Sequence, residues 1–181
     1  MRNVAAKLLA STGVLLLASG CATSDSLTTA SAPSTSRHAP RNVARAPSSA
    51  SYVASASSIE LYEIESAQLA LQRATSRRVR DFAAMVLDAH KGASMQLSLA
   101  GRRLNLLPSA TLNAAHQAMM DELRATPGFD SAYVKQQMAV HRDALSLHRN
   151  YAALGTSPTL RPVAASLVPV FQRYLRLLGN L

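Results

Sequence analysis

Three histidines fall at positions where a bundle helix should carry only apolar side chains. His141 and His148 lie between Phe129 and Tyr151, where apolar residues recur every three or four positions. His90 lies in a similar stretch between Arg77 and Leu104. This spacing is typical of the inward stripe of a helix in a bundle. An imidazole on such a stripe is either a hydrogen-bonded core group or a metal ligand.

A carboxylate accompanies these histidines. Glu63 falls on the expected inward stripe of an earlier helix, from about Tyr52 to Ala74, whereas Glu60 and Glu65 lie beside that stripe and are expected to face solvent. Imidazoles and a carboxylate on facing helices can hold Zn, Fe or Cu. The candidate ligands are Glu63, His90 and His141, with His148 as a weaker candidate.

Two other interpretations of these residues stay open. The polar side chains can form a hydrogen-bonded network that fixes helix register and binds nothing. Alternatively, Met85, Met95 and Met138 can join the imidazoles in a Cu(I) site, although methionine at helical spacing also fills cores. A di-iron centre is not expected, because it needs Glu-x-x-His pairs on two helices and the chain has none.

The elements that must position these residues are helices. Of the 181 residues, 48% are hydrophobic and 4% aromatic, and alanine and leucine dominate, which favours helices. The breakers between helical stretches are Thr75-Ser76, Pro108, Pro127-Gly128 and Gly155. The sequence predicts an all-α, ferritin-like four-helix up-down bundle with a short extra helix, from about Ser109 to Thr126, in the crossover. A last helix should run from Ser157 to Leu178, with a kink at Pro169.

The N-terminus predicts export and anchoring. Residues 1–20 carry a basic start, Arg2 and Lys7, and an apolar core too short to span a bilayer, as in a signal peptide. The stretch Leu17-Ala18-Ser19-Gly20-Cys21 is similar to a bacterial lipobox and contains the only cysteine, so Cys21 is the expected lipidation site. Ordinary secretory cleavage is the alternative. By the sorting rules of lipoproteins, Ala22 implies the periplasmic face of the outer membrane.

Residues 21–51 follow as a tether. They are rich in Ser, Thr, Ala and Pro and have no apolar period, so they are expected to be disordered. Residues 52–181 are then the helical bundle domain. The net charge of +9 suits an anionic envelope surface, and without aromatic stacking platforms we expect no nucleic-acid partner.

Three helical segments resemble the DUF4142 family of exported bacterial proteins. The segments are Glu63-Ile64-Glu65-Ser66-Ala67-Gln68-Leu69-Ala70, then Phe82-Ala83-Ala84-Met85 with His90, and Phe129-Asp130-x-x-Tyr133 with Gln137 and His141. The resemblance covers about residues 52–178 and implies a ferritin-like bundle of uncharacterised function. The sequence departs from the family in two places. It has Ala89-His90 where Asp-His is usual, and Tyr174 where the last helix usually has a histidine.

The sequence favours a non-enzymatic, membrane-tethered bundle of the bacterial envelope with a role in stress tolerance or surface integrity. It contains no nucleophile elbow, phosphate-binding glycine loop, CxxC pair or HExxH motif. The alternatives are a metal-binding protein of ferritin-like architecture and an envelope module that docks a protein partner.

Overall fold

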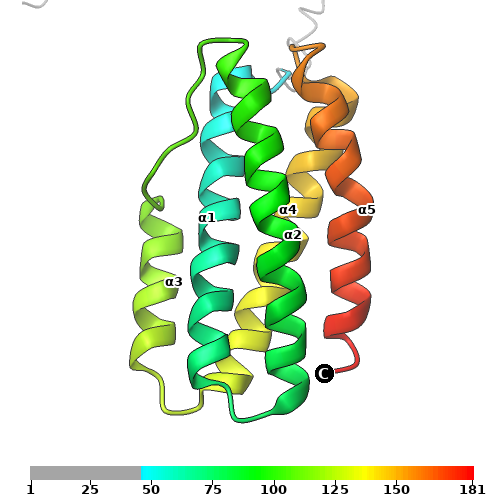
Figure 1. Ribbon diagram of the computed structural model, residues 1–181. Coiled ribbons are helices and arrows are strands. Elements are labelled where there is room, and N and C mark those ends of the chain that lie inside the picture. Colours follow the sequence, from blue (N-terminus) through cyan, green and yellow to red (C-terminus); the bar gives the residue numbers. More distant parts are fainter. Residues whose placement is uncertain (1–45) are drawn as a thin grey trace, which may run out of the picture. The chain divides into compact units, whose positions relative to one another are not determined.

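Five α-helices form the part of the chain that the computed structural model describes, residues 46–181 (Figure 1). They are α1 (Ser49–Arg73), α2 (Arg77–Arg102), α3 (Ala114–Ala125), α4 (Phe129–Leu154) and α5 (Leu160–Leu178). Within residues 46–181 there is no β-strand, and no helix combines the length and hydrophobicity that crossing a membrane requires. The predicted signal peptide, Cys21 and nearly all of the tether lie outside the described residues.

The long helices form an up-down bundle in which each contacts two others. Helix α1 packs against α2 and α4, and α5 packs against the same two. In Figure 1, α2 and α4 run in the direction opposite to α1 and α5, so every neighbouring pair is antiparallel. Helix α3 lies outside the four, against α1 and α4, and brings the chain back along the bundle. The prediction of an all-α four-helix bundle with a short crossover helix is confirmed.

The helix ends follow local signals. Gly155 closes α4, where a side chain would collide with Tyr151. Ser157 accepts hydrogen bonds from the backbone N–H groups of Thr159 and Leu160 and so caps the start of α5. Helix α1 begins at Ser49, three residues before the expected start, and α5 continues without interruption through the exposed Pro169.

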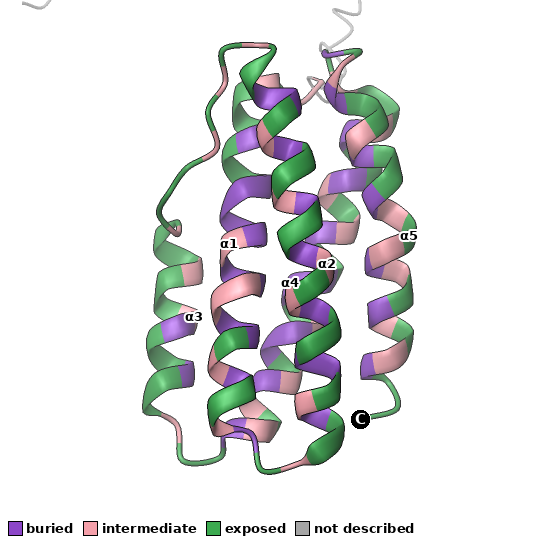
Figure 2. Cartoon of the chain, viewed as in Figure 1, coloured by how far each residue is buried: buried purple, intermediate pink, exposed green. Residues whose placement is uncertain are grey.

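The buried side chains run along the inner faces of the four long helices (Figure 2). On α2 they coincide with the expected stripe: Phe82, Val86, His90, Ala93, Leu97 and Ala100 are all buried. On α4 the three-to-four spacing predicts a stripe through Val134, Met138, His141 and Leu145. The observed stripe is displaced from it, because Tyr133, Gln137 and Ala144 are buried whereas Val134, Met138 and Leu145 are only half-buried. The inward position of His141 was predicted correctly despite this displacement.

Asp130 ties the start of α4 to the start of α2. Its carboxylate accepts hydrogen bonds from the N–H and hydroxyl of Thr75, at 3.1 and 2.8 Å, and from the N–H of Ser76, at 2.7 Å. Asp130, in the first turn of α4, thus binds the last two residues before α2. This clamp holds the two helices that carry His90 and His141.

We expect Asp130→Ala to lower the free energy of unfolding by about 1–3 kcal/mol, because it removes three hydrogen bonds to a charged acceptor that hold the turn before α2. Chemical denaturation of the variant measures the loss. Asp143→Ala is the matched control, since Asp143 is exposed on α4 and should change stability by less than about 0.5 kcal/mol. Equal stability of Asp130→Ala and the control would show that the clamp is not a significant contact.

Candidate metal centre

Side chains from three helices meet at mid-height in the bundle. Glu63 of α1, His90 of α2 and His141 of α4 each offer a ligand atom, and these atoms all lie within 4.8 Å of one another. All three side chains are fully buried, with at most 1% of their surface exposed. The structure therefore brings together the three residues that the sequence singled out.

A second carboxylate orients His90. The Nδ1–H of His90 donates to Oε2 of Glu60 at 2.8 Å, and Glu60 itself is only 1% exposed. The expectation that Glu60 faces solvent was wrong, because α2 covers the side of α1 that carries it. With Nδ1 engaged, the free position on the imidazole is Nε2, which has no protein partner.

His141 is held in a similar way by its own helix. Its Nδ1–H donates to the backbone carbonyl of Gln137 at 3.0 Å and lies 3.2 Å from Oε1 of Glu63. Apart from this contact, Nε2 of His141 and the carboxylate oxygens of Glu63 have no hydrogen-bond partner among the described residues. An imidazole whose Nδ1–H is fixed by a carboxylate or a carbonyl is the usual arrangement of a metal-ligating histidine.

Burial and neighbouring charges shift the pKa values of Glu63 and His90. Burial raises the pKa of Glu63, but the imidazoles of His141 and His90, together with Gln137, outweigh it, so its pKa falls below the usual value. Burial lowers the pKa of His90, and the carboxylates of Glu60 and Glu63 more than offset this, so its pKa is raised. A protonated His90 would then bury an Nε2–H that has no acceptor.

Aromatic side chains enclose the cluster. Phe82 lies on one side, with its ring 6.3 Å from that of His141, and Phe171 lies 5.4 Å from the rings of both His90 and His141. The buried hydroxyl of Tyr133 and Oε1 of Gln137 also lack protein partners. The site is thus a small group of unpaired polar atoms inside an otherwise apolar bundle.

The structure does not bring His148 to this cluster. His148 lies two turns further along α4, where its Nδ1 is 3.0 Å from the Tyr52 hydroxyl and its ring stacks on Phe171 at 5.0 Å. Among the described residues, the one group that could hold a metal contains Glu63, His90 and His141. The geometry therefore does not support His148 as a ligand of the same ion.

The methionines of the Cu(I) alternative lie apart from the cluster. Met85 is 39% exposed and Met95 64% exposed on the outer side of α2, and Met138 packs at the edge of the apolar cluster around Phe82. A site built from imidazoles and thioethers is therefore not formed here. The available donor atoms are nitrogen and oxygen.

Sequence reasoning missed two features near the site. One is Glu60, which lies three residues before Glu63 and therefore on nearly the same side of α1. This spacing could have indicated that Glu60 is buried, because α1 is covered on more than one side. The other is the attachment of the crossover to α1: Ser57 accepts from the N–H of Ser109, and Ser58 accepts from the N–H of Asn113. These two buried serines fix the segment that leads into α3.

A comparison with known protein families shows the family of this chain. Residues 32–181 match DUF4142, a domain of unknown function. The chain belongs to the DUF4142 family. The resemblance found in the three helical segments is thereby confirmed, over a range that extends into the expected tether. No curated protein matches the sequence.

Solved structures of similar fold include CopM and a DUF305 protein. CopM in its Cu(II)-bound form has a TM-score of 0.63 at 14% identity, covering 74% of this chain and 95% of CopM. The Cu(I)-bound form gives 0.61 at 14% identity, covering 72% and 91%. A DUF305 fragment from Deinococcus radiodurans gives 0.63 at 16% identity, covering 73% and 95%. At these identities the likeness establishes the shared bundle fold.

Proposed function

We propose that this DUF4142 protein binds one divalent transition-metal ion, Cu(II) or Zn(II), through Glu63, His90 and His141. The observation that carries the proposal is the set of unpaired atoms at the centre of the bundle. Among the described residues, Nε2 of both histidines and Oε2 of Glu63 are buried without a hydrogen-bond partner, and Oε1 of Glu63 lies 3.2 Å from Nδ1 of His141. Ligand atoms of the three residues lie within 4.8 Å of one another. Two imidazoles and a carboxylate are a common donor set for these metals.

A polar network that only fixes helix register explains the arrangement less well. Such a network is stable when every member is hydrogen-bonded, and each unpaired buried group costs about 1–3 kcal/mol. Here one nitrogen of each imidazole is paired: Nδ1 of His90 donates to Glu60, and Nδ1 of His141 to the carbonyl of Gln137. Nε2 of both rings has no hydrogen-bond partner among the described residues. A metal-ligating histidine commonly divides its two nitrogens in this way.

The charges favour a divalent ion. Glu60 and Glu63 bring two negative charges into a dry interior, and the two histidines bind a metal as neutral imidazoles. One divalent cation balances the two carboxylates, whereas Cu(I) or Ag(I) leaves one negative charge. Copper is expected to bind more tightly than zinc, because nitrogen and oxygen sites follow the Irving–Williams order. The copper-bound forms of CopM show that a bundle of this fold can carry copper.

The location of the protein in the cell envelope is proposed from its sequence. A signal peptide in residues 1–20 and lipidation of Cys21 would place the bundle on a tether at the outer membrane, facing the periplasm. A lipid-anchored metal-binding bundle there would act by sequestering an ion and not by catalysis. This agrees with a role of the protein in envelope stress.

Metal titration of the purified full chain tests the proposal. We expect one Cu(II) or Zn(II) per chain by calorimetry and elemental analysis. His90→Ala or His141→Ala should weaken binding by more than about 100-fold, because loss of even an outer partner of a ligand costs 10–100-fold. The matched control is His116→Ala, since His116 is half-buried on α3 and outside the cluster. Failure to take up stoichiometric metal, or undiminished binding in both alanine variants, would refute the proposal.

A further inference from the structure

The outward face of α2 carries a continuous stripe that no other described helix covers. Its members recur at intervals of three or four residues and all are exposed: Asp81, Met85, Asp88, Gly92, Gln96, Leu99 and Arg103. Figure 2 shows this exposed side along the length of α2. Leu99 is 58% exposed, and the flanking Met95 is 64% exposed. With Met85 they give this face of α2 three large exposed apolar side chains among charged and polar ones.

Gly92 occupies the middle of this stripe without an internal reason. Glycine inside a helix is unfavourable relative to alanine. A Cβ added at Gly92 would meet no atom within 4 Å, so no close approach within the chain requires a glycine there. A glycine on an open helix face does allow the backbone of a second helix to come close. This points to a helix from outside the chain.

The charges along the stripe are arranged for a second copy of the same helix. Asp81 and Asp88 lie in its N-terminal half, and Arg103 lies at its C-terminal end. When two copies cross in antiparallel fashion at Gly92, positions whose numbers add to 184 face each other. Asp81 then faces Arg103, Met85 faces Leu99, and Gly92 faces Gly92. A symmetric dimer requires this kind of self-complementary surface.

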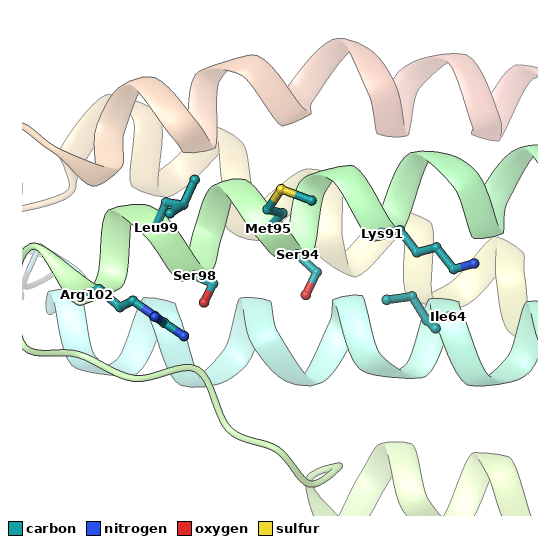
Figure 3. Close-up of a pocket in the computed structure, with 7 residues that line it drawn as sticks. All are labelled: Ile64, Lys91, Ser94, Met95, Ser98, Leu99 and Arg102. Atoms are coloured by element: carbon teal, nitrogen blue, oxygen red, sulfur yellow. The ribbon is translucent and has the colours of Figure 1, made fainter.

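We propose that the DUF4142 bundle forms a symmetric homodimer through antiparallel packing of α2 on α2. The groove beside the stripe enlarges the contact (Figure 3). It has a volume of about 470 Å³ and lies between α2 and Ile64 of α1, with Met95 and Leu99 on its α2 side. The stripe spans 23 residues, from Asp81 to Arg103, or about 33 Å. One helix pair with a flanking groove falls at the low end of interface sizes, so the dimer should dissociate in the micromolar range.

Sedimentation velocity of the full chain over a concentration series tests this dimer. Asp81→Arg places two arginines opposite each other, and Arg103→Asp places two aspartates opposite each other, so each should raise the dimer Kd at least about tenfold. The double variant restores opposite charges and should recover the affinity of the unchanged chain. Circular dichroism checks that the helical content stays the same, as both residues are exposed.

The control is Asp143→Arg, which reverses an exposed charge on α4, away from the stripe. It should leave the Kd unchanged. A chain that stays monomeric up to about 1 mM, a limit that corresponds to very weak association, would overturn the proposal. So would a dimer that tolerates both single reversals. Neither outcome depends on the metal site, because the stripe faces away from it.

Discussion

In the metal-free protein, His90→Leu should lower the free energy of unfolding by about 3–5 kcal/mol. Among the described residues, its imidazole is the only hydrogen-bonding partner of the Glu60 carboxylate, and it also helps to keep Glu63 ionised. Removing it leaves the buried carboxylate of Glu60 without compensation, while Glu63 keeps His141 alone. Breaking a buried pair by deleting one partner is costly for this reason, even when the intact pair contributes little.

Replacing the whole polar set should have the opposite effect. The variant that combines Glu60→Met, Glu63→Met, His90→Leu and His141→Leu removes all four ionisable groups and keeps similar volumes. We expect the metal-free form of this variant to be more stable than the unchanged chain, by about 1–4 kcal/mol, because apolar side chains of matching size need no desolvation. It should also lose all metal-dependent stabilisation.

Urea denaturation in the presence of a chelator measures both effects. His116→Leu is a suitable comparison, since His116 is half-buried and has no carboxylate partner, and it should cost much less than His90→Leu. A fourfold variant as unstable as His90→Leu would contradict this expectation. In that case the cluster would be a structural network that the fold requires.

The stability of the metal-free protein should fall by about 3 kcal/mol between neutral pH and pH 4 through His148 alone. Burial first, and then the charge of His90, lower the pKa of His148 from 6.5 to about 4. The unfolded chain takes up this proton near pH 6.5, whereas the folded chain resists it. The stabilisation is therefore complete above pH 6.5 and is lost as the pH falls toward the folded pKa.

His148→Gln isolates this contribution. The amide can still hydrogen-bond the hydroxyl of Tyr52, the group that contacts Nδ1 of His148, but it does not titrate. Denaturation curves at several pH values should show the unchanged chain losing stability relative to the variant as the pH falls through this window. Parallel pH profiles for the two proteins would mean that His148 titrates normally. A proton NMR titration of His148 gives the pKa directly.

The sequence alone determined the helices and the inward direction of the three candidate ligands. Breakers such as Gly155 placed the turns, and the short connections made consecutive helices antiparallel. Along α2 all six positions that the three-to-four spacing identified are buried, including His90, and the spacing missed only Val79, Ala83 and Gly101. The meeting of Glu63, His90 and His141 followed from periodicity once the helices were arranged as a bundle.

Only the tertiary structure decided which neighbour each face meets. Periodicity gives a direction about the axis of one helix and does not say which other helix covers it. Helix α1 is covered by α2, α3 and α4, so the carboxylate of Glu60 lies against His90 instead of in water. In the same way, Asp130 at the start of α4 binds Ser76 just before α2, across 54 residues of sequence. Contacts between distant segments depend on how the helices pack, and the packing depends on the side chains of all the helices together.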